Sequence, residues 1–130
     1  MIGTISTIAI VALGGAVGAT VRYGVNIGAV QAFGHGFPYG TMIVNILGSF
    51  LMGIFIAKFS HITSIPHEIR HLCMTGFLGA FTTFSTFSLD FVTLWGRGEL
   101  VQAGLYLLLS VILSISALFL ALWIMRGLGS

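Results

Sequence analysis

The chain has 130 residues, of which 57% are hydrophobic and only 6% are charged, with a formal net charge of +2. Soluble globular domains carry about a quarter of their residues as charged side chains, so this composition excludes an ordinary soluble domain. The five Lys and Arg residues are scattered, which excludes a nucleic-acid-binding surface, and the mean hydropathy of +1.09 indicates a protein that lies in a lipid bilayer.

Four apolar blocks predict an all-α membrane protein with four transmembrane helices, forming a single domain over residues 1–130. The blocks cover about residues 5–30, 39–59, 72–95 and 100–124, and each is long enough to cross a bilayer once. The segments between them are rich in glycine, proline or histidine and are typical of loops. No Lys or Arg precedes the first block, so we expect it to stay in the mature protein and not to be cleaved as a signal peptide.

The first block combines small residues with one buried charge. Gly14 and Gly18, and again Gly24 and Gly28, are spaced as GxxxG pairs, which let helix backbones approach closely in lipid. Arg22 lies deep in the same block, where a charged side chain is costly and is therefore a functional candidate. It could attract an anion, or it could donate hydrogen bonds to carbonyls at a helix end.

Polar residues form one row on the second block and another on the fourth. Each row repeats every four residues, so its members share one helix face. Such rows either join helices by hydrogen bonds or line a polar track through the membrane. Two aligned rows in so small a protein favour the track. The rows are Thr41, Asn45 and Ser49, and Gln102, Tyr106, Ser110 and Ser114.

The third block contains a run from Gly76 to Ser88 that is poor in helix-forming residues. We expect the helix to break between Gly79 and Thr83, which would free backbone carbonyls that a small cation such as Na⁺ could bind. Phe84 and Phe87 lie three residues apart on one face. Their rings are either core packing or, through their positive edges, a contact for an anion.

Two rival functions also have some support in the sequence. His67, Glu68 and His71 match the HExxH pattern of zinc metalloproteases, but no third ligand is evident, and Pro66 and Glu68 equally suit a helix start. A proton-coupled transporter of the small multidrug type needs a titratable carboxylate within the membrane, and Asp90 lies toward one end of the third block. A purely structural subunit would leave the polar rows unexplained.

Four spans would place both termini and the loop after the second span on one side of the membrane. That side would hold Lys58, Arg70 and Arg126, and the other Arg97 with or without Arg22. Orientation normally follows a clear Lys and Arg asymmetry. Because the difference is small, the chain could insert both ways up and form an antiparallel homodimer.

The whole chain resembles the CrcB/Fluc family of small bacterial fluoride channels. The resemblance rests on Arg22, Gly40-Thr41, Val44-Asn45 with Gly48, Arg70, the string from Thr75 to Gly79, and the string from Thr82 to Ser88. It implies a dual-topology antiparallel homodimer in the bacterial inner (plasma) membrane, with two fluoride pores and a Na⁺ at the dimer centre. Its role would be the passive export of cytoplasmic fluoride.

The resemblance also implies roles for single residues. Asn45 looks like the pore asparagine, and Phe84 and Phe87 look like the pore phenylalanines. Gly79 and Thr82 match the positions whose carbonyls bind Na⁺, and Arg22 matches an arginine of the first helix. Asp90 departs from the glutamate expected in many members. The polar track of the fourth helix corresponds to Tyr106, Ser110 and Ser114, and Thr41 joins the fluoride pathway with Asn45.

Overall fold

The computed structural model describes residues 2–62 and 64–129, and all regular secondary structure in this part of the chain is helical. Four of its helical segments are long and apolar enough to cross a membrane, which confirms the predicted spans. The elements are α1 (Ile2–Phe33), α2 (Tyr39–His61), α3 (His67–His71), the π-helix η1 (Leu72–Leu78), α4 (Gly79–Phe81), α5 (Phe84–Gly96) and α6 (Leu100–Gly129).

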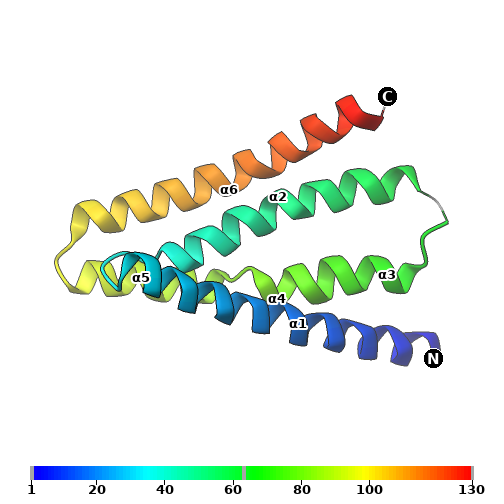
Figure 1. Ribbon diagram of the computed structural model, residues 1–130, viewed down its shortest axis with the longest axis horizontal. Helices are drawn as coiled ribbons and strands as arrows, with labels where there is room; N and C mark the ends of the chain where they lie inside the picture. The colour runs from blue at the N-terminus through cyan, green and yellow to red at the C-terminus, as the bar shows by residue number, and fades with distance from the viewer. Residues whose placement is uncertain (1, 63, 130) are drawn as a thin grey trace.

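The four spans run in alternating directions (Figure 1). The first span and the third, which consists of α3 to α5, run one way, while α2 and α6 run the other way. Both chain ends therefore lie at the same end of the molecule as the loop between α2 and α3 (Figure 1). Helix α6 packs along α2 and against α5, and in its C-terminal half Leu118 and Ala121 still lie against Gly53 of α2.

Glycines allow α1 to lie against the third span at backbone contact distance. A Cβ atom at Gly14 would lie 2.6 Å from the carbonyl oxygen of Leu72, and one at Gly18 would clash with the carbonyl oxygen of Phe77. Gly76 on η1 meets α1 in the same way. The pair Gly24 and Gly28 differs, because a Cβ at either position would have no neighbour within 4 Å in the described part of the chain. Of the two GxxxG pairs, only the first therefore packs helices together in the described part of the chain.

The third span changes geometry twice before it reaches α5. Residues 72–78 form a π-helix, which no pattern in the sequence predicted. After α4, Thr82 and Thr83 adopt extended backbone angles, with ψ values of 158° and 122°. The hydroxyl of Thr83 then accepts a hydrogen bond from the Thr86 N–H at 3.2 Å, so Thr83 is the N-cap that starts α5.

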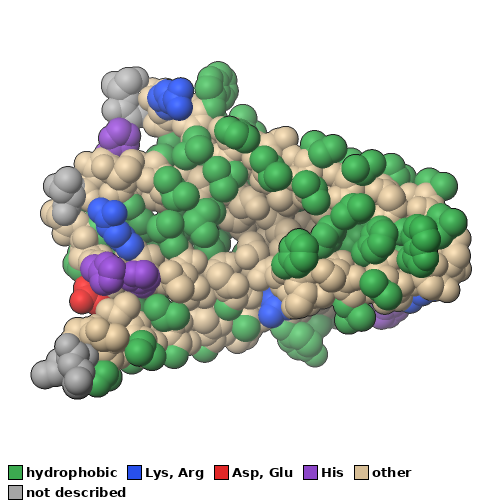
Figure 2. All heavy atoms as spheres, turned by 180° about the vertical axis from the view of Figure 1, so that it is seen from behind, with side chains coloured by type: hydrophobic (Ala, Val, Ile, Leu, Met, Phe, Trp, Pro, Cys, Tyr) green, Lys and Arg blue, Asp and Glu red, His purple; other side chains and the backbone are tan. Residues whose placement is uncertain are grey.

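Two small clusters form the buried core, one on each side of this interruption. Phe87, Leu94, Ala103 and Tyr106 pack between α5 and α6, and Val44, Leu78 and Phe81 pack between α2 and the η1–α4 segment. Outside these clusters, large apolar side chains cover the surface (Figure 2). An apolar surface of this extent fits contact with lipid tails and not with water.

Candidate functional site

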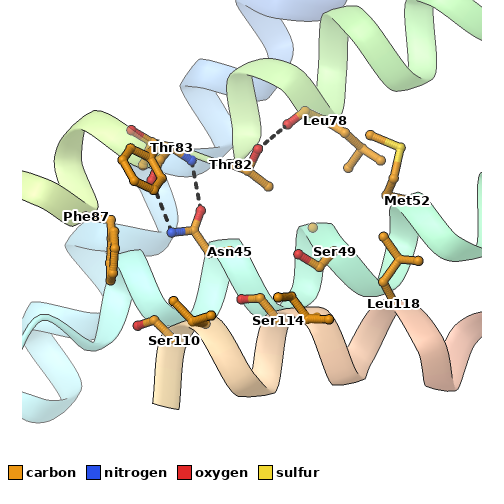
Figure 3. A pocket seen from close by; sticks show the side chains of 14 residues that line it. Asn45, Ser49, Met52, Leu78, Thr82, Thr83, Phe87, Ser110, Ser114 and Leu118 are labelled. Atoms are coloured by element: carbon orange, nitrogen blue, oxygen red, sulfur yellow. Dashed lines mark hydrogen bonds between the residues drawn. The ribbon is translucent and has the colours of Figure 1, made fainter. Parts of the chain in front are cut away.

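A cavity of about 430 Å³ lies where the interrupted third span faces α2 and α6 (Figure 3). The polar positions of three different spans meet in it, although they are far apart in the sequence. Apolar residues such as Met52 and Leu118 close one end (Figure 3). Its polar and aromatic lining consists of Asn45, Ser49, Thr82, Thr83, Phe84, Phe87, Ser110 and Ser114.

The side chain of Asn45 holds the interruption through two hydrogen bonds (Figure 3). Its Nδ2 donates to the carbonyl oxygen of Thr83 at 3.1 Å, and its Oδ1 accepts from the backbone N–H of Thr83 at 2.8 Å. An amide can donate and accept at once, which matches a backbone N–H and C=O that have left a helix. One Nδ2 hydrogen of Asn45 is not used in this pair.

This arrangement removes helical hydrogen bonds from two carbonyls. In a continuous helix the Thr83 N–H would donate to the Gly79 carbonyl, but it donates to Asn45 instead. Likewise the Thr86 N–H, which would pair with the Thr82 carbonyl, donates to the Thr83 hydroxyl. The Gly79 and Thr82 carbonyls thus lack the donors that a regular helix would give them.

Arg22 donates from Nε to the carbonyl oxygen of Ala80 at 2.9 Å, from α1 to the last turn before the interruption. Of the two roles open to this residue, the observed contact is the hydrogen bond to a helix-end carbonyl. A guanidinium within the apolar spans is costly unless it is hydrogen-bonded, and Ala80 provides one acceptor. Arg22 is not among the residues that line the cavity.

Ser110 and Ser114 contribute hydroxyl groups without protein partners. Both Oγ atoms are buried, and neither has a hydrogen-bond partner within residues 2–62 and 64–129. Ser110 is only 4% exposed and its side chain lies on the cavity side of α6 (Figure 3). Because an unpaired buried hydroxyl is unfavourable, these two groups are available to bind something that enters the cavity.

Three aromatic rings continue from this cavity toward the start of α2. Phe84 and Phe87 have ring centroids 5.6 Å apart, and Phe87 lies 5.2 Å from Tyr106. The two phenylalanines differ in exposure, since Phe84 is 78% exposed and Phe87 only 7%. Phe87 and Tyr106 belong to the core cluster between α5 and α6, whereas Phe84 lines the cavity and remains exposed.

Tyr106 contacts Phe87 of this cavity and also a lining residue of a second cavity of about 230 Å³. Its hydroxyl donates to Oδ2 of Asp90 at 2.9 Å, and Asp90 lines the second cavity together with Thr41 and Thr86. Most of the predicted pathway residues therefore line the first cavity, Thr41 lines the second, and Arg22 and the fully buried Tyr106 line neither. The partnership of Asp90 with Tyr106 was not predicted, because the spacing within one helix says nothing of which helix faces it.

Gly79 and the HExxH residues lie elsewhere. Gly79 is exposed and lines neither cavity, and His67, Glu68 and His71 all lie on α3. Among the residues that the structure describes, no group of three or more His, Cys, Asp or Glu side chains is placed to hold a metal ion. The third ligand of a zinc protease site, which the sequence did not reveal, is not supplied by the described fold either.

Comparison with known proteins gives a consistent picture over nearly the whole chain. A family model described as CrcB-like protein, Camphor Resistance (CrcB), matches residues 9–122. A protein of Mesorhizobium japonicum named fluoride-specific ion channel FluC is 50% identical, over 92% of this chain and 95% of its own length. Proteins of the same name from Cereibacter sphaeroides and Vibrio parahaemolyticus are 49% and 50% identical, over 95% and 88% of this chain and 97% and 91% of theirs.

These matches confirm the resemblance that the sequence motifs indicated. With its four apolar helices, the chain is a multi-pass membrane protein. It belongs to the family of CrcB-like proteins.

Proposed function

We propose that this protein is a fluoride-selective channel that lets cytoplasmic fluoride leave the bacterial cell passively through the inner membrane. The observation that carries the proposal is the pair of buried, unpaired hydroxyls of Ser110 and Ser114, which face a cavity at membrane depth opposite Asn45. Relatives about 50% identical over most of the chain are named fluoride-specific ion channels, which supports the choice of ion.

The lining suits a small anion better than a cation or an organic molecule. Fluoride accepts strong hydrogen bonds. When the ion leaves water, closely spaced donors must replace its hydration shell. The hydroxyls of Ser110 and Ser114 and the free Nδ2 hydrogen of Asn45 are such donors. The ring edges of Phe84 and Phe87 would add positive electrostatic potential for the anion. They would bind it less strongly than a charged side chain.

We further infer that two copies assemble as an antiparallel, dual-topology homodimer. Two features support this inference. The cavity is lined in part by Phe84, which is 78% exposed in one subunit, so a second copy would close it. The small difference in Lys and Arg between the two ends leaves insertion in both orientations open.

A structural Na⁺ near the interruption is also part of the proposal. The chain offers two carbonyls there, of Gly79 and Thr82, that have lost their helical donors, while Arg22 occupies the carbonyl of Ala80 between them. Neutral backbone oxygens are suitable ligands for a hard monovalent cation in a membrane protein. When bound, the ion would supply a fixed positive charge where the helix is interrupted.

Fluoride efflux from liposomes that contain the purified protein tests the channel. Vesicles loaded with fluoride receive valinomycin to carry K⁺, and chloride-loaded vesicles serve as the parallel control. We expect rapid electrogenic loss of fluoride without loss of chloride and without any need for a proton gradient. Fluoride transport that requires a proton gradient would support a coupled transporter, and no movement of either ion in dimeric protein would refute the channel.

A further inference from the structure

Two histidines of α3 have no role in the proposed channel. They lie at the end of the molecule that holds both chain ends (Figure 1). His67 and His71 lie one helical turn apart, and their ring centroids are 4.2 Å from each other with an interplanar angle of 76°. His67 is exposed and His71 is half-buried. Figure 2 shows histidine side chains at the surface of this end, away from both cavities.

The backbone under the pair is well supported. Helix α3 has only five residues, but it passes into η1 without a non-helical residue, since Leu72 keeps α-helical angles. Pro66 precedes the first turn, where it fixes the backbone and removes no helical hydrogen bond. The i, i+4 spacing therefore places both imidazoles on one face of a continuous helix.

One contact of His71 can orient its ring toward a metal ion. Its Nδ1 lies 3.0 Å from the hydroxyl oxygen of Thr75, one turn further along the helix. When Nδ1–H donates to that oxygen, Nε2 carries the free lone pair. A hydrogen bond to the second ring nitrogen is the usual way in which proteins orient an imidazole ligand.

The positive charge of Arg70, which lies between the two histidines in the sequence, is directed away from them toward α2. The guanidinium of Arg70 donates from Nη2 to the carbonyl oxygens of Phe59 at 2.9 Å and Ile62 at 3.1 Å, so it is held at the end of α2. Glu68, the nearest acidic residue in the sequence, adds a compensating negative charge on the same helix.

We propose that His67 and His71 form a surface site for one divalent transition-metal ion of the imidazole-binding class, such as Ni²⁺, Cu²⁺ or Zn²⁺. Two imidazoles that share an ion through nitrogens about 2.0–2.1 Å away have ring centres roughly 4.5–5.2 Å apart, for bond angles of about 90–109°. The observed separation of 4.2 Å lies just below this range, so the two rings must move slightly apart and turn one nitrogen each toward the shared ion. Water would fill the remaining positions, and the site is independent of the proposed channel because neither histidine lines a cavity.

The test is isothermal titration calorimetry, in which Ni²⁺ is added to the tag-free, full-length protein in detergent. We expect one ion per subunit, and an affinity that falls at least about tenfold in His67→Ala and in His71→Ala. His35→Ala and His61→Ala are matched controls, since both residues are exposed histidines outside the pair, and they should keep the affinity within a factor of about two. Equal losses in the controls, or absence of binding in the unaltered protein, would overturn the proposal.

Two further measurements do not depend on the folding of the alanine variants. Electron paramagnetic resonance of the unaltered protein with Cu²⁺ should show hyperfine splitting from two imidazole nitrogens, and splitting from one or none contradicts a shared site. Thr75→Val keeps both ligands and removes the partner of His71, so it should weaken Ni²⁺ about tenfold while the two-nitrogen Cu²⁺ spectrum persists. Unchanged affinity in Thr75→Val would refute the orienting hydrogen bond.

Discussion

Asn45 shows how much a single amide can do in this fold. It closes two hydrogen bonds with the backbone of Thr83, and it still has a donor that can face the cavity. The same residue thus holds the interrupted span and contributes to the proposed pathway. Substitutions that change its charge and its hydrogen bonds separately can distinguish the two roles.

We predict that Asn45→Asp lowers fluoride efflux at least about tenfold, equivalent to roughly 1.4 kcal/mol at the barrier. The carboxylate would repel the anion and would face the Thr83 carbonyl without a hydrogen to donate. Asn45→Ala removes both hydrogen bonds without adding charge. If the two variants lose flux equally in the liposome assay while remaining dimeric, the negative charge is not the cause.

Ser110 allows a sharper distinction, because its hydroxyl has no protein partner in the described chain. Ser110→Ala should leave the free energy of unfolding within about 0.5 kcal/mol of the original value, or raise it, since no hydrogen bond to the fold is lost. Fluoride efflux should nevertheless fall severalfold, because a donor to the anion is removed.

Ser116→Ala is the matched control on the same helix, since Ser116 is exposed and lies outside both cavities. Stability is measured by unfolding in increasing denaturing detergent and efflux with a fluoride electrode. A clear loss of stability in Ser110→Ala with normal efflux would make Ser110 a helix-packing residue.

At the level of the helices, the contact between α1 and the third span depends on glycine. A side chain at Gly18 would meet the carbonyl oxygen of Phe77, a backbone atom that cannot rotate away. We predict that Gly18→Ala destabilises the protein by about 1–3 kcal/mol, because the helices must separate. Gly24→Ala, where a Cβ has no neighbour within 4 Å in the described chain, should be neutral or stabilising by about 0.5–1 kcal/mol.

The same detergent unfolding assay compares these two variants. Equal effects of Gly18→Ala and Gly24→Ala would show that helix propensity, and not contact with η1, decides the outcome. Loss of stability in Gly24→Ala alone would instead point to a second subunit packed on that face of α1.

The transmembrane spans could be predicted from the sequence, whereas the contacts between them could not. Hydrophobic runs long enough for a bilayer allowed all four spans to be placed, and the four-residue polar rows singled out Asn45 and Ser110, which the structure places in the lining of one cavity. The pairing of Asn45 with Thr83 could not be predicted, because it joins residues 38 positions apart on different spans. The π-helix was not predicted either. Which GxxxG pair contacts the third span depends on how α1 packs, and the spacing within α1 does not reveal this.

At the scale of the whole molecule, the cavity lining includes a large aromatic side chain that the described chain leaves exposed. The cavity lies between α2, α6 and the third span, and Phe84 in its lining is 78% exposed although Phe87, three residues later, is buried. A phenylalanine with this exposure either contacts a second subunit, contacts the ion, or faces lipid. Each alternative has a different consequence when the ring is replaced.

We predict that Phe84→Ile lowers fluoride efflux at least about tenfold, or roughly 1.4 kcal/mol at the barrier, while the protein remains dimeric. Isoleucine keeps the site apolar but has no ring edge to offer the anion, so permeation should suffer more than assembly. Leu89→Ile is the matched control, because Leu89 lies on the same helix, is 64% exposed, and lines neither cavity. Efflux is followed with a fluoride electrode, and dimer content by chemical cross-linking in the same liposomes. Loss of the dimer would assign Phe84 to the subunit contact, whereas normal efflux with an intact dimer would leave the ring facing lipid.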